Sequence, residues 1–319
     1  MMERNMTRDD LIHSLDVLPF SRLVWNSEAA RTKWEPVIGA VASLHDRAEY
    51  EMVRLGKRKC GTLHLAPHNF HVLIERLKKD GMVWLPIQWS KNYSGFAHYH
   101  LPTTVGDPNS SCYGVMARNL EDAEAFRTAS AYNGRNAGKV DHEVIGELLG
   151  FPPCCAKFFV EEWGNGFFDP VWQSAVRGNG VMVGDRTLEV EGNVFTNQML
   201  RYFGFRITSH FPCSLNCEAT KEVGEVWLDV MKKMDADLAD LLVEILEMPL
   251  IWSCLHGIAI VETPIFTIIT NSLPTKESWT VMYNAPGKPK ASAELIPLGS
   301  DVDYDKLTEA MVEQLQWRR

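Results

Sequence analysis

The stretch 250–270, LIWSCLHGIAIVETPIFTIIT, consists of short apolar runs separated by turn-forming residues. Its three runs, 250–254, 258–262 and 265–270, are rich in Ile, Val, Trp and Thr, which fit the surface of a sheet. Only a few residues separate one run from the next, which is typical of tight connections. The stretch therefore predicts an antiparallel meander.

Helical and β-rich segments alternate along the rest of the chain. Apolar residues recur with helical periodicity in four segments upstream, at 31–54, 69–79, 120–131 and 141–149. Asp141 is the expected N-cap of the last of these helices, and Gly150 its C′ residue. Further β-rich runs occupy 82–88 and 180–191. The fold class is therefore α+β, with helices and short antiparallel strands.

The second half of the chain shows the clearest order of elements. After 180–191 we expect a helix at 193–203, a short strand at 205–208, one or two helices over 218–246, the meander and a final helix from Tyr304. Gly and Asn residues at 134–138 loosen the chain. The sequence thus indicates an N-terminal α+β region, 1–138, and a metal-binding α+β region, 139–319, or a single domain spanning both.

Composition limits the class of protein. A net charge of −9 argues against non-specific nucleic-acid binding, which depends on Lys and Arg neutralising phosphates. No apolar stretch reaches the ~20 residues that span a bilayer, and the first ten residues do not resemble a signal peptide. We therefore expect a cytoplasmic protein with no membrane contact. In that compartment the seven cysteines point to metal or redox chemistry rather than disulfides.

Four of the seven cysteines fall into two tight pairs. The first pair lies in GFPPCCAKFF, residues 150–159, where Pro153 suits the first turn of a helix and Cys154 and Cys155 follow it. Unpaired N–H groups and the helix dipole at such an end stabilise thiolates. These two thiols are therefore expected beside a helix N-terminus.

The second pair repeats this arrangement. In HFPCSLNCEAT, residues 210–220, a proline again precedes the cysteines. With Ser214 as N-cap, Cys213 would lie just outside a helix and Cys217 in its first turn. The sequence therefore predicts one metal site in the C-terminal half, between two helix N-termini and bound by all four cysteines.

The spacing favours an iron–sulfur cluster as the cofactor. A [4Fe–4S] cluster accepts thiolates at irregular and even adjacent positions. Zinc is the alternative, although structural zinc sites usually use Cys-x₂₋₄-Cys knuckles, and the adjacent Cys154 and Cys155 do not easily present both sulfurs to one tetrahedral ion. A metal-free dithiol oxidoreductase is a further alternative, but a disulfide between adjacent cysteines is strained.

The leading functional hypothesis is an iron–sulfur enzyme that performs reductive, sulfur-transfer or Lewis-acid chemistry on a small molecule or a nucleobase. His210 is a candidate ligand, hydrogen-bond donor to a sulfur, or proton donor. Arg135, in a turn beside Tyr132, is a candidate for holding an anionic or planar ligand. The rival hypothesis is a zinc-stabilised binding or nucleic-acid-processing protein. Cys60, Cys112, Cys254 and the histidines of residues 64–100 are expected to have no metal role.

Overall fold

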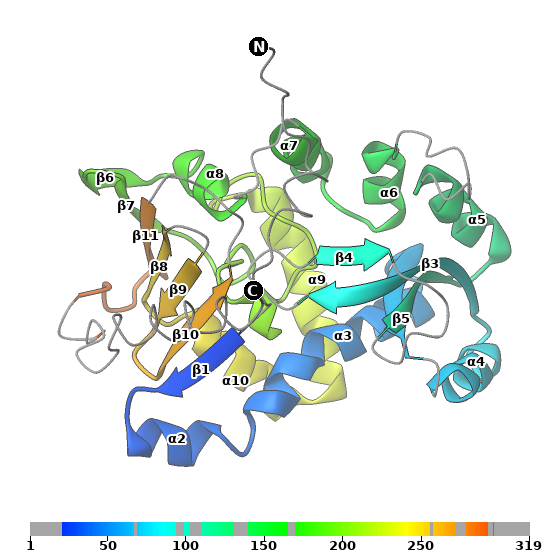
Figure 1. Cartoon of the computed structure of the whole chain (residues 1–319), viewed down its shortest axis with the longest axis horizontal. Coiled ribbons are helices and arrows are strands. Elements are labelled where there is room, and N and C mark those ends of the chain that lie inside the picture. The colour runs from blue at the N-terminus through cyan, green and yellow to red at the C-terminus, as the bar shows by residue number, and fades with distance from the viewer. Residues whose placement is uncertain are drawn as a thin grey trace, which may run out of the picture.

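The computed structural model of the chain describes residues 21–66, 69–93, 99–102, 110–130, 140–164, 170–255, 258–271, 279–292 and 296. Helices combine with two mainly antiparallel sheets, which confirms the α+β class (Figure 1). The helices are α2 (Glu28–Trp34), α3 (Ile38–Arg54), α4 (Phe70–Lys79), α5 (Leu120–Ala129), α6 (His142–Leu148), α7 (Pro153–Gly164), α8 (Pro170–Val176), α9 (Glu218–Met234) and α10 (Ala236–Leu246). Within the described part, none of them is both long and apolar enough to cross a bilayer.

A seven-stranded sheet contains the predicted meander. Its strands are β1 (Ser21–Trp25), β6 (Val181–Gly184), β7 (Thr187–Glu191), β8 (Leu250–Leu255), β9 (Ile258–Glu262), β10 (Phe266–Asn271) and β11 (Trp279–Asn284). They follow the order β1-β10-β9-β8-β11-β7-β6, in which only β11 and β7 run parallel. The first strand of the described residues, β1, thus forms one edge, antiparallel to β10.

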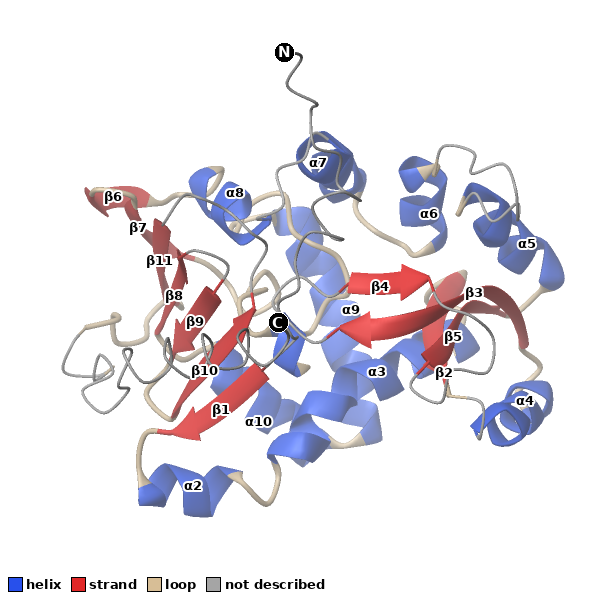
Figure 2. Ribbon diagram, in the orientation of Figure 1, coloured by secondary structure: helices blue, strands red, loops and turns tan. Residues whose placement is uncertain are grey.

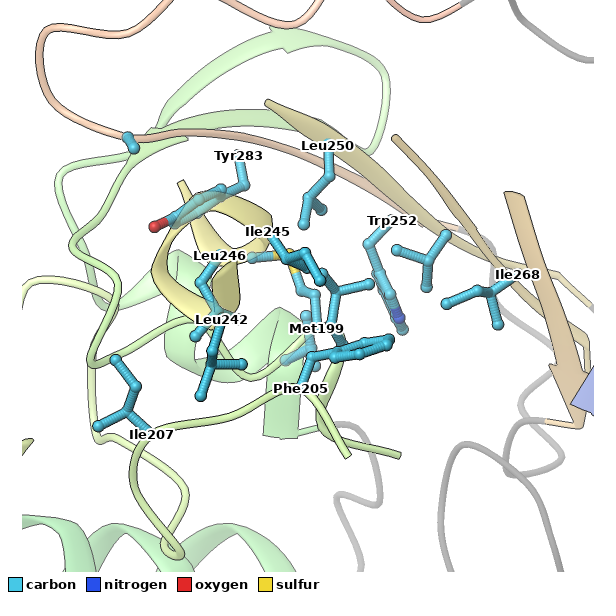
Figure 3. Packing of buried hydrophobic residues seen from close by; sticks show 14 of the residues in the cluster. Met199, Phe205, Ile207, Leu242, Ile245, Leu246, Leu250, Trp252, Ile268 and Tyr283 are labelled. Carbon is cyan, nitrogen blue, oxygen red and sulfur yellow. The ribbon is translucent and has the colours of Figure 1, made fainter. Parts of the chain in front are cut away.

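Alternation along β8 directs side chains to both faces of this sheet. Leu250 and Trp252 are fully buried in the main hydrophobic core, which they share with residues of α10 and of the 199–207 segment (Figure 3). Ile251, between them, packs with Ala291 and Ile296 in a separate cluster. Both faces of β8 are therefore covered, which explains why its sequence is almost continuously apolar.

The second sheet has four strands, in the order β2-β5-β3-β4. These are β2 (Cys60–Leu65), β3 (Val83–Tyr93), β4 (Tyr99–Pro102) and β5 (Ser110–Ala117), and all neighbours are antiparallel. Figure 2 shows α3 and α9 between the two sheets. Helix α3 contacts β2 and β5 of this sheet as well as α9 and α10, and on its other side Val41 and Leu44 belong to the main core shared with the seven-stranded sheet.

Of the predicted helical segments, 31–54 is divided in the structure, and 218–246, expected as one or two helices, forms two. The expected helix at 31–54 is interrupted after Trp34, because Pro36 cannot donate a backbone hydrogen bond. The expected segment 218–246 forms two helices, and Asp235 caps the second by accepting a hydrogen bond from the Leu238 N–H (3.1 Å). The expected helix from Tyr304 lies outside the described residues. So does the 138/139 boundary, and the division into two regions stays a prediction.

The predicted helix at 193–203 and strand at 205–208 are wrong. The first segment forms turns that end in a 3₁₀ helix, Arg201–Phe203, and the second is not hydrogen-bonded into a sheet. The Asn193 carboxamide oxygen accepts from the backbone N–H groups of Phe195 and Thr196, at 3.0 and 3.2 Å. Because such side chains satisfy the backbone locally, neither helix nor sheet is needed here.

A buried histidine lies where α3 meets α9. His45 stacks on Trp227, with centroids 4.7 Å apart and planes within 4°, and its Nδ1 lies 3.2 Å from the Ile207 carbonyl. Its Nε2 has no hydrogen-bond partner among the described residues. Burial, followed by the charges of Arg206 and Arg58, holds the pKa of His45 well below its usual range. The imidazole is therefore neutral in the folded protein.

Substituting His45 should reduce the pH dependence of stability. Unfolded His45 regains a pKa near ~6.5, so the unfolded state takes up a proton below that pH and the folded state does not. The contribution of His45 to the free energy of unfolding is therefore fully present above about pH 6.5. Below that pH it declines by up to ~1.4 kcal/mol per pH unit. His45→Asn, which can keep a donor near Nδ1, should show a shallower decline in urea titrations between about pH 6.5 and 5. An identical decline in both proteins would contradict this assignment.

Candidate metal centre

The first cysteine pair lies in the first turn of α7. Gly150, with φ of 66°, ends the preceding helical segment, and Pro153 is the first residue of α7, as its sequence predicts. The Pro152 carbonyl accepts hydrogen bonds from the N–H groups of Cys155 and Ala156, at 2.9 and 3.0 Å. The turn therefore presents Cys154 and Cys155 at the positive end of the helix.

The second pair is held by a turn rather than by the predicted cap. Helix α9 begins at Glu218 with Cys217 as its N-cap residue, not at Ser214. The Ser214 hydroxyl accepts from the Asn216 N–H (3.1 Å), and the Ser214 carbonyl from the Cys217 N–H (3.1 Å). Ser214 thus closes its own turn. This places Cys213 before the turn and Cys217 at its end, beside the start of α9.

All four sulfurs converge on one point. They lie within 4.8 Å of one another. The Sγ atom of Cys154 is 3.8 Å from those of Cys155 and Cys217, and the latter two are 3.7 Å apart. The Cys213 N–H also donates to Cys155 Sγ (3.4 Å). The structure therefore brings together four thiols that can hold a metal ion, and the adjacent Cys154 and Cys155 both face the same centre.

The four cysteines differ in exposure. Cys155 and Cys217 are buried, at 1% and 8% exposed, whereas Cys154 is exposed and Cys213 is half-buried. The centre thus has an inner side within the protein and an outer side towards solvent. Solvent access on the outer side gives a metal ion a path to the inner sulfurs.

Hydrogen bonds among the sulfurs determine their protonation. A hydrogen bond with Cys155 is the main cause that lowers the pKa of Cys217 to about 4, and the same bond, followed by burial, raises the pKa of Cys155. Burial is also the main cause that raises the pKa of Cys213 to about 12. In the metal-free group Cys217 is therefore a thiolate beside the protonated thiols of Cys155 and Cys213. Metal binding must displace their protons, so affinity should rise with pH.

A buried hydrogen-bond chain connects this group to His210. Thr220, which is fully buried one turn into α9, places its Oγ1 3.2 Å from Cys155 Sγ and 2.9 Å from His210 Nε2. Burial, followed by the charges of Arg201 and Arg58, lowers the pKa of His210 to about 3. A neutral His210 can donate its Nε2 proton to Thr220, whose hydroxyl then donates to Cys155. The imidazole thus reaches the sulfur through Thr220.

A cavity of about 390 Å³ adjoins the inner side of the cysteine group. Its wall includes Cys155 and His210, together with the aromatic side chains Phe151, Phe159 and Phe211. These residues come from α7 and from the segments that directly precede the two cysteine pairs. The cavity can therefore place a small molecule next to one of the four sulfurs.

Sequence reasoning missed part of this arrangement. Thr220 lies three residues after Cys217, where one helical turn aligns side chains, and that spacing was the available signal. Phe158 is buried in the core, whereas its neighbour Phe159 lines the cavity. Arg135 lies outside the described residues. Within the described ranges, no metal-ligand group of three or more His, Cys, Asp or Glu other than the four cysteines is found.

In comparisons with known proteins, no family model matches the chain, and neither a curated protein nor a solved structure is significantly similar to it.

Proposed function

We propose that Cys154, Cys155, Cys213 and Cys217 bind one zinc ion, which fixes the starts of α7 and α9 and thereby forms a wall of a small-molecule-binding cavity. The convergence of the four sulfurs within 4.8 Å carries this proposal. A site with four thiolates has no open coordination position, so its zinc is structural. The protein is then a zinc-stabilised binding protein.

The distances between the sulfurs support a single ion. With Zn–S bonds of ~2.3 Å, the sulfurs of a tetrahedral site stand about 3.8 Å apart. The three Sγ–Sγ distances among Cys154, Cys155 and Cys217 are 3.7–3.8 Å. In a cubane cluster each thiolate binds a separate iron, so the sulfurs would need to stand farther apart.

An iron–sulfur enzyme is the second candidate, and the uneven exposure of the cysteines favours it. Cys154 and Cys213 lie on the solvent side of the group, so they can separate without disturbing the buried Cys155 and Cys217. A [4Fe–4S] cluster there would supply reductive, sulfur-transfer or Lewis-acid chemistry. His210, in the cavity wall, would be the candidate proton donor.

Metal analysis of anaerobically purified, untagged protein tests both candidates. The zinc proposal expects about one zinc per chain and a colourless protein. The cluster candidate expects about four irons with acid-labile sulfide and absorption near ~400 nm. Protein that folds but contains neither metal, and binds neither zinc nor a reconstituted cluster, would overturn the metal proposal and leave the dithiol alternative.

Thr220→Val should weaken metal binding while retaining the fold. Valine has nearly the shape of threonine, but it removes the hydroxyl that bonds Cys155 Sγ and His210. Losing a hydrogen-bond partner of a metal-binding side chain typically lowers metal affinity 10- to 100-fold. We therefore expect the metal affinity of Thr220→Val to fall about tenfold or more. Competition with a chromophoric chelator at constant pH measures it. Thr220→Ser, which keeps the hydroxyl, is the control, and equal losses in both variants would argue against the hydrogen-bond chain.

A further inference from the structure

The cavity next to Cys155 is formed by segments that are distant in the sequence. Ile87 and Gln88 of β3 face helices α6 and α7 across it, and Ser209, His210 and Phe211 lie beside them. Its volume of about 390 Å³ is at the small end of the range for ligand sites. The space is suited to a molecule of one or two rings rather than to a polymer segment.

Planar groups are stacked along one wall. The Arg201 guanidinium lies 3.9 Å from the centroid of the Phe211 ring. The rings of Phe211 and Phe159 are parallel within 9°, with centroids 6.4 Å apart. In the wall of the same cavity, the Phe151 and His210 rings contact each other, with centroids 5.3 Å apart. A flat aromatic ligand can stack on such surfaces over its whole ring. A puckered ring of similar size makes less contact with them.

The charges around the cavity favour a negative group. Among the described residues that line it, Arg201 carries the one permanent positive charge, and there is no Asp or Glu. Arg58 lies behind Phe151, 5.9 Å from that ring, but the buried Glu49 carboxylate, 2.9 Å from its Nη1, balances most of its charge. Both arginines lower the pKa of His210, which is consistent with a positive potential there. In the proposed centre a zinc ion with four thiolates carries a net negative charge, so an anionic group is favoured beside Arg201 rather than beside Cys155. A cationic group beside Arg201 is disfavoured.

We propose that this cavity binds a small, flat aromatic or heteroaromatic molecule bearing one anionic group such as a carboxylate. The ring packs against Phe159 and Phe211, and the anion lies towards Arg201. His210, Gln88 and Ser209 supply polar contacts at the edges. This inference rests on the proposed function, because the bound metal fixes the two turns that shape the wall.

Three matched probes test the ligand class on metal-loaded, full-length protein. Benzoate is flat and anionic, cyclohexanecarboxylate is anionic but puckered, and benzylamine is flat but cationic. Saturation-transfer NMR titrations should show benzoate binding with a Kd in the range of about 1 mM, since so small a ligand makes few contacts. Each of the other two probes should bind at least about fivefold more weakly, the size of effect expected from losing aromatic contact or from charge repulsion.

A pair of phenylalanine variants tests the location. Phe159→Leu removes one stacking surface and should weaken benzoate binding about threefold or more. Phe70→Leu is the control, because Phe70 is also half-buried but packs on Trp84 and Trp89, away from the cavity. It should leave the Kd unchanged.

The outcomes separate this inference from the metal proposal when metal content is measured on the same samples. Metal-loaded protein that shows no benzoate signal at about 10 mM, or that binds all three probes equally, overturns the ligand class. Equal effects of Phe159→Leu and Phe70→Leu overturn the location. Selective benzoate binding by protein that cannot bind metal supports the cavity but overturns the metal proposal.

Discussion

Cys213→Ala and Cys217→Ala are each expected to reduce bound metal from about one equivalent to near zero, because three thiolates leave a tetrahedral ion incompletely held. Cys155→Ala should have the same effect, since its buried sulfur faces both Cys154 and Cys217. Cys154 is exposed, so a water molecule can most easily take its coordination position when it is removed. Elemental analysis of purified variants, with circular dichroism to verify folding, measures the result.

The three remaining cysteines provide the controls. Cys60 is buried beside the Asp122 carbonyl, Cys112 is buried in β5, and Cys254 is buried in β8. None of them belongs to the converging group. Cys60→Ala, Cys112→Ala and Cys254→Ala should therefore keep full metal content. A normal metal content in Cys217→Ala would remove the second cysteine pair from the site.

Glu49→Ala should destabilise the protein by about 3–5 kcal/mol, because it leaves the Arg58 guanidinium buried without its carboxylate. Arg58 is 5% exposed, and its Nη1 donates to Glu49 Oε1 at 2.9 Å. Its Nε and Nη2 have no hydrogen-bond partner among the described residues. The guanidinium also lies over the Trp227 ring, 5.2 Å from its centroid, so the charge cannot turn towards solvent without breaking the core. Urea denaturation measures the free energy of unfolding.

Two variants identify the cause of this loss. Glu49→Leu combined with Arg58→Met removes both charges and should recover much of the stability, since apolar replacement of a whole buried pair is often close to neutral. Glu147→Ala breaks the exposed ion pair with Lys59, also 2.9 Å long, and should change stability by less than about 1 kcal/mol. Equal losses in Glu49→Ala and Glu147→Ala would show that burial does not govern the cost.

The sequence predicted the elements that are determined by residues close to one another in the chain. The meander at 250–270 follows from strand-forming runs and short connections, and α6 follows from Asp141, whose side chain accepts from the Val144 N–H (3.1 Å). The proline before the first cysteine pair indicated the start of α7, in whose first turn Cys154 and Cys155 lie. These features depend on residues a few positions apart, which a sequence displays directly.

Features that depend on contacts between distant segments were not predictable. The segment 193–208 has an apolar periodicity, but the side chains of Thr196 and Asn197 donate hydrogen bonds to the distant carbonyls of Leu215 (2.6 Å) and Leu246 (3.0 Å) and help to hold it in turns. The cavity joins β3 to α6 and α7, and no local pattern relates Gln88 to Phe159. The convergence of two cysteine pairs was a hypothesis from similar spacing, whereas the distances that favour a single ion required three dimensions.

The pairing of β1 with β10 has a consequence for synthesis of the protein on the ribosome. Ser21 pairs with Thr270, so β1 emerges long before the only strand that it hydrogen-bonds in the described sheet. At about 5–20 residues per second, the partner follows roughly ten to fifty seconds later. During that interval an unpaired strand can join strands of other chains. The seven-stranded sheet is therefore completed only after β11, which ends at Asn284, has been translated.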